Sequence, residues 1–371
     1  MQIKSVIRIL GLLLMLFSLA IIPPIVVSII YSDGETWSFF YALILIFVSG
    51  LLLWLPAMQA KTDLKLRDGF IIVVLFWFVL STFASLPMVL SESLSISITD
   101  AIFESISGLT TTGATILNNI DDLPKSILFY RQYLQWLGGL GIIVLAVAVL
   151  PMLGVGGMQL YKAEVAGPIK NKITPRITET AKWLWIVYLT MTIVCGASYY
   201  IAGMPIFDSI CHSFSTIAIG GFSIHNESFG YYDNHWIELV AIFFMIAACL
   251  NFSLHYLAFK NKSLSGYKND NEAYFFIFLI FLISLLTILY VSNISEDMNV
   301  KEIIKNIFYA VSISTTTGFT NSNYFNYVGF LPLLLILFSF IGGCAGSTAG
   351  GMKVIRVMLL LKQGYRELVR L

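Results

Sequence analysis

Charged residues are scarce in this sequence: Asp, Glu, Lys and Arg make up 12% of 371 residues, whereas 58% are hydrophobic. A mean hydropathy of +0.84 and apolar runs near or beyond the roughly 20 residues needed to cross a bilayer exclude a soluble protein. The net charge of +1 gives no sign of a nucleic-acid surface. We therefore expect an all-α polytopic membrane protein that contacts lipid and binds no nucleic acid.

Groups that carry catalysis are also lacking. His225 and His235 lie in an expected exterior loop, His255 lies near a helix end, and His212 stands alone on a short helix, where a structural role is favoured over a catalytic one; no His-Glu-x-x-His motif occurs. The cysteines are widely spaced and form no Cys-x-x-Cys pair, so they predict small buried side chains rather than a metal site or a disulfide framework. They are Cys195, Cys211, Cys249 and Cys344. We expect neither an enzyme nor a tightly bound cofactor.

Apolar runs predict eight membrane crossings. If the chain starts inside, 18 of 22 basic residues lie on the cytoplasmic side and 14 of 21 acidic residues lie outside, as the positive-inside rule requires. Both ends are then cytoplasmic. The expected crossings are Val6 to Tyr31, Trp37 to Met58, Phe70 to Leu90, Ile127 to Leu150, Trp183 to Ala202, Trp236 to Phe259, Tyr274 to Val291 and Tyr324 to Leu361.

Three exterior segments align without gaps, which indicates internal duplication. They are "DAIFESISGLTTTGAT" (Asp100 to Thr115), "DSICHSFSTIAIGGFS" (Asp208 to Ser223) and "KNIFYAVSISTTTGFT" (Lys305 to Thr320). One column holds Gly113, Gly221 and Gly318, and hydroxyl residues occupy the columns six positions before and two positions after it. Each repeat contains two crossings, so all three segments lie on the same side of the membrane.

A helix of about ten residues cannot span a bilayer, so each short helix and its Thr/Gly stretch predict a re-entrant loop. Unpaired carbonyls at that depth are tolerated only in protein or in a wet cavity, and a ring of them can replace the water shell of a cation. Asp100 and Asp208 are expected to cap the two short helices at whose starts they lie. The alternative, a Ser/Thr-rich exterior turn without a ligand, is disfavoured by three aligned copies.

With these segments, "LQWLGGLGIIVLAVAVLP" (Leu134 to Pro151) and "GGCAGSTAGGMK" (Gly342 to Lys353) make the chain resemble the TrkH branch of the Trk/Ktr/HKT potassium transporters. The resemblance covers essentially the whole chain. It implies repeated helix–pore loop–helix units around a central pore, preceded by a helical hairpin, with K+ as the transported ion. The implied filter residues are Thr110, Thr111, Thr112, Gly113, Ala218, Ile219, Gly220, Gly221, Thr315, Thr316, Thr317 and Gly318.

The resemblance divides the chain into an N-terminal transmembrane hairpin (1–68) and pore units at 69–180, 181–272 and 273–371. In the family, a glycine at the first filter position, here Gly113, accompanies potassium rather than sodium permeation. The family has four pore units, and the period places a fourth filter glycine between about residues 415 and 426. We therefore expect the sequence to be incomplete. The alternative function is a nonconducting or regulatory membrane subunit that lacks one pore unit.

Glycines interrupt the last expected crossing at "GGCAGSTAGG", and each interior glycine weakens a helix by roughly 1 kcal/mol relative to alanine. The resemblance identifies this stretch as an intramembrane loop that gates the pore, whereas small residues also suit close helix packing. Lys353 and Arg356 either bias the loop electrostatically or anchor the cytoplasmic side. The expected gate residues are Gly342, Gly343, Cys344, Ala345, Gly346, Ser347, Thr348, Ala349, Gly350, Gly351 and Lys353.

Two charged residues follow their filter glycines by 18 and 17 positions, namely Arg131 and Glu238. They are expected either to adjust the cation concentration at the outer mouth or to snorkel to the interface. The resemblance further implies a cytosolic nucleotide-binding regulatory subunit, a homodimer, and a bacterial cytoplasmic (inner) membrane location. Uptake is then passive or coupled to an ion gradient, as in a symport.

Overall fold

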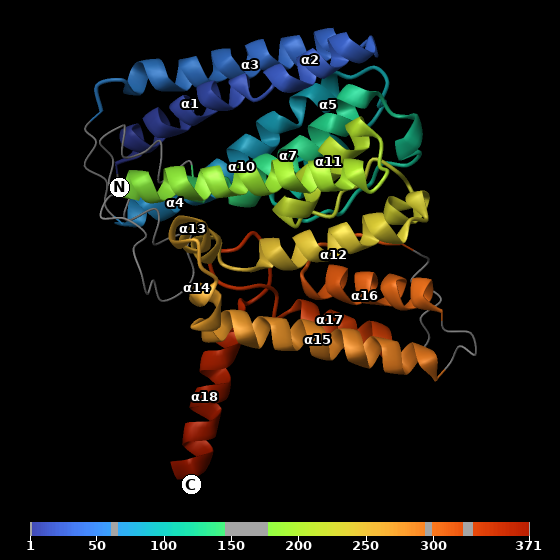
Figure 1. Ribbon diagram of the computed structural model, residues 1–371. Coiled ribbons are helices and arrows are strands. Elements are labelled where there is room, and N and C mark those ends of the chain that lie inside the picture. Colours follow the sequence, from blue (N-terminus) through green and yellow to red (C-terminus); the bar gives the residue numbers. More distant parts are fainter. Residues whose placement is uncertain (1, 61–65, 145–176, 294–298, 322–328, 371) are drawn as a thin grey trace. The chain divides into compact units, whose positions relative to one another are not determined.

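The computed structural model describes residues 2–60, 66–144, 177–293, 299–321 and 329–370, and within these ranges the regular secondary structure is helical, without strands (Figure 1). The chain divides into two compact subdomains. The first comprises Met1–Ala166 and Thr174–Lys182, and the second comprises Gly167–Ile173 and Trp183–Leu371. The first filter segment therefore belongs to the first subdomain, and the second and third belong to the second.

The first subdomain joins an N-terminal helical hairpin to a group of helices around the first filter segment. Pro23 and Pro24 account for the break between α1 and α2, because proline has no N–H to continue the helical ladder. Helices α4 and α7 both pack against α6. The helices are α1 (Ile3–Leu19), α2 (Ile22–Tyr31), α3 (Thr36–Trp54), α4 (Leu66–Ala84), α5 (Leu86–Leu90), α6 (Ile98–Leu109) and α7 (Lys125–Val144).

Two glycines bring α1 and α3 together in the hairpin, and the two helices run alongside each other in Figure 1. A Cβ on Gly11 would lie 2.7 Å from the Gly50 carbonyl oxygen, and a Cβ on Gly50 would lie 2.8 Å from that of Gly11. Small residues permit such approach of helix backbones, which compensates for the absence of a hydrophobic driving force between helices in lipid. The hairpin expected from the sequence is therefore present.

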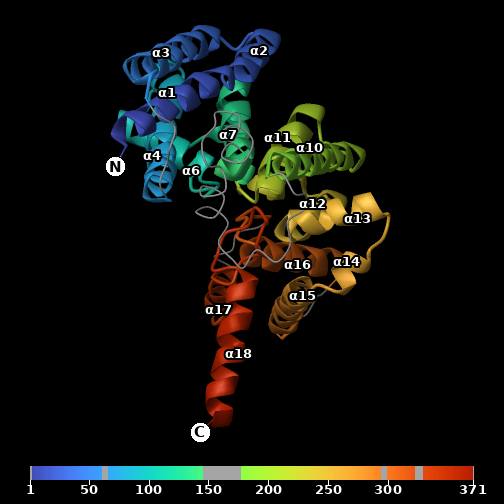
Figure 2. The same cartoon turned by 90° about the vertical axis from the view of Figure 1, so that its left-hand side faces the viewer.

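The second subdomain places α16 between α12, α15 and α17. Its buried core includes Ile283, Tyr309, Ala310, Leu331 and Leu335, whereas α18 extends away from the other helices of this subdomain and is exposed along most of its length (Figures 1 and 2). The helices are α10 (Ile177–Ile201), which belongs to this subdomain from Trp183 onward, α11 (Ile206–Ala218), α12 (His235–Cys249), α13 (Phe252–Asn261), α14 (Ser265–Lys268), α15 (Asn271–Ser292), α16 (Val300–Ser314), α17 (Leu331–Ser339) and α18 (Val354–Arg370).

Five helices of the described chain are long and apolar enough to cross a membrane, or up to six if α12 and α13 form one broken span. They correspond to the first, second, third, fifth and seventh expected crossings. The fourth expected crossing, Ile127 to Leu150, begins in α7 and continues outside the described residues. The start of the eighth, at Tyr324, also lies outside the described residues. The five spans are Ile3–Tyr31, Thr36–Ala57, Ile71–Leu90, Lys182–Ile201 and Asn271–Ser292.

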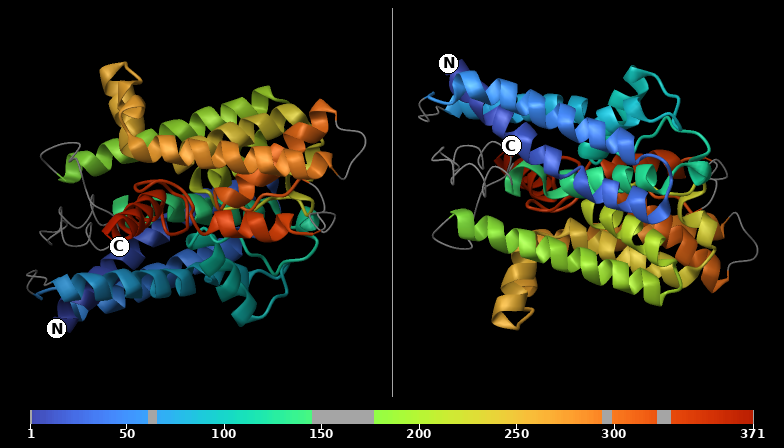
Figure 3. Two further views of the ribbon diagram at one scale, coloured as in Figure 1. Left: turned by 90° about the horizontal axis from the view of Figure 1, so that it is seen from below. Right: turned by 90° about the horizontal axis from the view of Figure 1, so that it is seen from above.

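The sixth expected crossing is wrong as a continuous helix, because the chain bends by 96° between α12 and α13. Leu250 leaves the helical conformation, and the Asn251 side chain accepts a hydrogen bond from the Ser253 backbone N–H at 2.8 Å, which caps α13. Figure 3 shows α13, in gold, projecting from α12. An asparagine within an apolar run thus starts a new helix.

Candidate functional site

Each filter segment follows a helix too short to span a membrane: α6 has 12 residues, α11 has 13 and α16 has 15. The expectation that Asp100 and Asp208 cap these helices is wrong, since both lie within the first turn. Ser97 caps α6 by accepting from the Asp100 N–H at 3.1 Å, and Asn299 caps α16 in the same way. The N-cap position of α11 is Pro205, which has no side-chain acceptor.

All three short helices end in the same Schellman motif. The backbone N–H groups of Thr112, Gly220 and Thr317 donate at 2.9 Å to the carbonyls of serines five residues earlier. Those serines, Ser107, Ser215 and Ser312, are the column that lies six positions before the glycine. The shared hydrogen bond shows that the sequence repeat is also a repeat of local structure.

Backbone angles repeat in the same register. Two positions before the glycine, Thr111, Ile219 and Thr316 have φ of 53°, 56° and 67°, a left-handed conformation that is uncommon for residues with a Cβ. The glycines Gly113, Gly221 and Gly318 have φ of 75°, 82° and 85°, where glycine alone is unstrained. The twelve expected filter residues thus lie on three segments that leave their helices in one conformation.

The second and third filter segments lie against each other within the second subdomain. A Cβ on Gly221 would overlap the Thr317 carbonyl oxygen. Nearby, the Phe229 N–H donates to the Thr320 carbonyl at 2.8 Å, and the rings of Phe229 and Phe319 are 4.6 Å apart. The sequence prediction that these two segments converge is therefore supported by a direct backbone approach.

The first filter segment is held by a buried ion pair that sequence reasoning missed. Arg131 Nε donates to Glu104 Oε1 at 2.7 Å, and both side chains are fully buried. The Thr115 hydroxyl lies 3.0 Å from the same carboxylate oxygen and accepts from Arg131 at 3.1 Å. Neither alternative for Arg131, an outer-mouth charge or a snorkelling side chain, is correct. Gly138 of α7 lies so close to α6 that a Cβ would overlap the Leu109 carbonyl oxygen.

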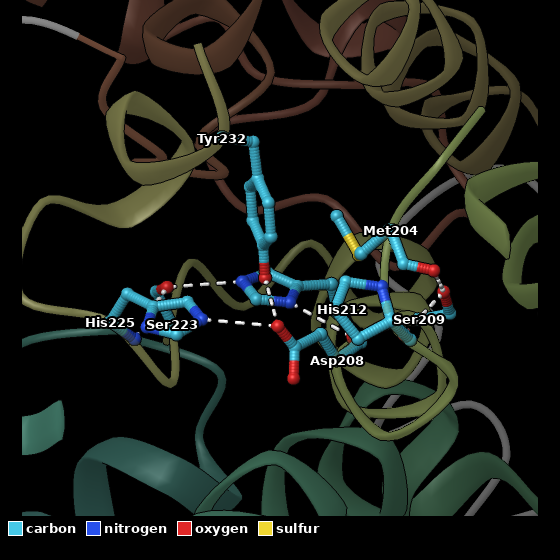
Figure 4. A network of polar contacts seen from close by, with 8 residues as sticks. Met204, Asp208, Ser209, His212, Ser223, His225 and Tyr232 are labelled. Carbon is cyan, nitrogen blue, oxygen red and sulfur yellow. Dashed lines mark hydrogen bonds and ion pairs between the residues drawn. The ribbon is translucent and has the colours of Figure 1, made fainter. Parts of the chain in front are cut away.

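A polar network links residues at both ends of the second filter segment to Tyr232 and His225 in the loop that follows it (Figure 4). The Asp208 carboxylate accepts from Tyr232 at 2.8 Å and from His225 Nε2 at 3.1 Å. Burial alone would raise the pKa of Asp208, but these hydrogen bonds outweigh it and lower the pKa, so the group stays ionised at neutral pH. His212 is buried in the same network and lies 3.0 Å from the Ser223 hydroxyl.

Asp233 connects the loop after the second filter segment to the start of α16. Lys301 Nζ lies 2.9 Å and Lys305 Nζ 3.4 Å from its carboxylate. The hydrogen bond from Lys301 lowers the pKa of this exposed group. Glu238, expected at the mouth or the interface, is instead buried, and the Asn321 amide donates to it at 2.7 Å.

The glycine-rich stretch Gly342 to Gly351 is a non-helical loop between α17 and α18, as its composition predicts. It contacts both filter segments of its subdomain. The Thr348 hydroxyl donates to the Ile217 carbonyl at 2.9 Å, and the Gly350 N–H donates to Thr316 Oγ1 at 2.8 Å. Two of the expected gate residues, Thr348 and Gly350, therefore contact the second and third filter segments.

Three further sets of hydrogen bonds hold this loop. Glu272 Oε1, at the start of α15, accepts from the N–H groups of Ala345 at 2.7 Å and Ile355 at 3.1 Å. The loop also exchanges backbone hydrogen bonds with the α12–α13 bend, from Cys344 to the Cys249 carbonyl and from Phe252 to the Gly346 carbonyl. Lys353 Nζ donates to the carbonyls of Ser347 and Ala349, which indicates a role within the loop rather than at the membrane surface.

The four cysteines are buried, as predicted, and each is a free thiol. The described residues contain no group of three or more His, Cys, Asp or Glu side chains arranged to hold a metal ion. Repeated pore loops between apolar helices define a polytopic membrane protein of the pore-loop class.

Comparison with known proteins identifies the family. Residues 36–371 match the model of the TrkH family, described as a cation transport protein, and the chain belongs to that family. Two relatives named Trk system potassium uptake protein TrkH are similar over the whole chain: that of Halomonas elongata at 51% identity and that of Vibrio parahaemolyticus at 52%, with 77% of each relative covered. Family membership makes the chain a transporter rather than an enzyme.

A solved structure is similar as well, which confirms the predicted fold class. The crystal structure of the potassium transporter TrkH from Vibrio parahaemolyticus superposes with a TM-score of 0.89 at 49% sequence identity. The match covers all of this chain and 76% of the solved one.

Proposed function

We propose that the protein takes up K+ through a pore in which backbone carbonyls of the three filter segments replace the ion's water shell. The observation that carries the proposal is the threefold repetition of a Schellman motif followed by a glycine with positive φ. The names of the relatives support potassium as the ion, and Gly113 at the first filter position agrees. The alternative, a nonconducting regulatory subunit, is not favoured by relatives named as uptake proteins.

We assign the pore units to residues 69–180, 181–272 and 273–371, as expected from the sequence, after the hairpin at 1–68. We place the protein in the bacterial inner membrane with both ends cytoplasmic, because this orientation leaves most basic residues inside. The relatives' Trk system name supports further Trk components, and we assign a nucleotide-binding regulatory subunit and a homodimer as partners. The exposed basic helix α18 offers a cytosolic surface for them.

Complementation tests the proposal. A bacterial strain that lacks its own potassium uptake systems, expressing the full-length protein, is expected to grow at low external K+. The purified protein in liposomes is expected to give saturable uptake of radioactive rubidium that K+ competes with more strongly than Na+. Membrane-inserted protein that neither rescues growth nor carries rubidium would refute the proposal.

The loop from Gly342 to Lys353 is the proposed gate. Its contacts with Ile217 and Thr316 reach the second and third filter segments, and five glycines make alternative conformations accessible. Glu272 holds the loop on both sides, since one carboxylate oxygen accepts from Ala345 and Ile355. The docked loop corresponds to the nonconducting state.

Replacing Glu272 by alanine removes the shared acceptor and is expected to raise basal rubidium flux in liposomes by at least about tenfold, since even one hydrogen bond to a charged group contributes about 1.5–3 kcal/mol. Glu272→Gln keeps an acceptor oxygen and is expected to give an intermediate flux. Glu367→Ala, on the exposed part of α18, serves as the control and should leave flux unchanged. An unchanged or lower flux in Glu272→Ala would exclude this restraining role.

A further inference from the structure

In two of the three filter segments, the side chain nine positions before the glycine contacts the hydroxyl group two positions after it. Nine positions before Gly113 stands Glu104, whose carboxylate accepts from the Thr115 hydroxyl at 3.0 Å. Nine positions before Gly221 stands His212, with Nε2 3.0 Å from the Ser223 hydroxyl. Thr115 and Ser223 each lie two positions after their glycine. A side chain of the short helix therefore holds the chain just beyond the filter in both copies.

The hydrogen-bond network fixes the form of His212. Its Nδ1 lies 3.0 Å from the Asp208 backbone carbonyl, which only accepts, so Nδ1 carries the proton. In the neutral imidazole, Nε2 then accepts a hydrogen bond from the Ser223 hydroxyl. The Ser223 oxygen in turn accepts from the backbone N–H of His225 at 3.1 Å. His225 Nε2 donates to Asp208 and closes the network (Figure 4). The Asp208 carbonyl thereby holds Nδ1 of His212, and Nε2 binds the Ser223 hydroxyl.

The first copy makes the equivalent contact with an ionic group. Glu104 is paired with Arg131 and also accepts from the Ile116 N–H at 3.2 Å. In the third copy the column holds Tyr309, and the chain after the filter is held differently. There the Ser312 hydroxyl donates to the Phe319 carbonyl at 2.7 Å, and the Thr320 N–H donates to Ser228 at 3.3 Å.

We propose that Glu104 and His212 are positioning residues for cation selection, each fixing the exit of its filter segment through the hydroxyl of Thr115 or Ser223. The inference rests on the proposed function of these segments as a filter. The Schellman motif fixes the chain before each glycine and this contact fixes it after, so the carbonyls between them have little freedom to move. A filter that contracts around a smaller ion would accept Na+ as readily as K+.

Two amide substitutions separate this role from general stability. His212→Gln places an amide near the former Nε2 and retains reach to Ser223, whereas His212→Asn places it near the former Nδ1 and retains only the Asp208 carbonyl. In liposomes containing the full-length protein, His212→Asn and Ser223→Ala are each expected to lower the K+/Na+ preference by about 5- to 10-fold, the effect of one lost hydrogen bond. His212→Gln and Ser223→Thr are expected to retain it. His235→Asn, outside the network, is the matched control.

The double variant His212→Asn with Ser223→Ala is expected to match either single variant, because both remove one interaction. The inference would be overturned if the losses of K+/Na+ preference in the two single variants added up in the double variant, or if His212→Gln and His212→Asn had equal K+/Na+ preferences. Rubidium flux in the unchanged protein would in that case still support the proposed function. Absence of flux in the unchanged protein would instead reject the proposed function. Where a variant inserts poorly, the same preference is measured in Thr115→Val against Thr115→Ser, and an unchanged preference there would overturn it equally.

Discussion

Replacing Gly221 by alanine is expected to reduce selective rubidium uptake by at least about tenfold. The left-handed φ of 82° costs a residue with a Cβ about 1–2 kcal/mol, and the new Cβ would overlap the Thr317 carbonyl oxygen. Because that carbonyl belongs to the neighbouring filter segment, relieving the overlap must separate the two segments. Uptake of rubidium and its competition by K+ and Na+ in liposomes measure the effect.

The substitution Gly318→Ala separates the effect of backbone strain at positive φ from the effect of steric overlap of the new Cβ. Its φ of 85° is equally unfavourable, but a Cβ there would meet no described atom within 4 Å. A smaller loss of uptake is therefore expected than for Gly221→Ala. Gly364→Ala on α18 adds a methyl group in open space at an ordinary φ and is the neutral control. A Gly221→Ala protein that selects and transports like the unchanged one would contradict the approach of the second and third segments.

Removing Arg131 is expected to have the largest effect on folding. Arg131→Ala leaves the Glu104 carboxylate buried without its charged partner, and breaking such a pair costs about 3–5 kcal/mol. Thermal unfolding of the detergent-solubilised protein, followed by size-exclusion chromatography, is expected to show a clearly lowered midpoint.

The double variant Arg131→Met with Glu104→Gln distinguishes loss of the pair from loss of packing. It removes both charges and keeps similar volumes, so it is expected to be more stable than Arg131→Ala. Arg366→Ala, on the exposed face of α18, controls for removal of an arginine. If the double variant is as unstable as Arg131→Ala, the buried charge is not the cause.

Repetition made the filter predictable from the sequence. One "TTTG" proves little, but alignment of Gly113, Gly221 and Gly318 located all three segments, and the structure gives them one backbone conformation. The interruption at Gly342 to Gly351 was equally predictable, since its glycines act through local backbone propensity. Local signals of this kind persist whatever the chain packs against.

Features that depend on distant partners were not predictable. Arg131 and Glu238 looked like interfacial charges because their partners, Glu104 and Asn321, lie 27 and 83 residues away. The cap of α6 at Ser97 was missed because Asp100 was the more conspicuous acidic residue, and no cap was predicted for α16, where Asn299 supplies it. The contact between Glu104 and Thr115 could have been sought, because both residues lie in aligned columns of the repeat. The first of these columns holds a carboxylate in one copy and an imidazole in another, so the shared role of Glu104 and His212 was not recognised.

The bend at Leu250 and the loop after α17 depend on each other. Each interrupted helix leaves backbone groups without their usual partners, and the bonds from Cys344 to Cys249 and from Phe252 to Gly346 let one interruption satisfy the other. Straightening either helix alone would strand amides of its neighbour in an apolar medium. Substitutions that restore regular helix at one interruption should therefore be tolerated only alongside a compensating change at the other.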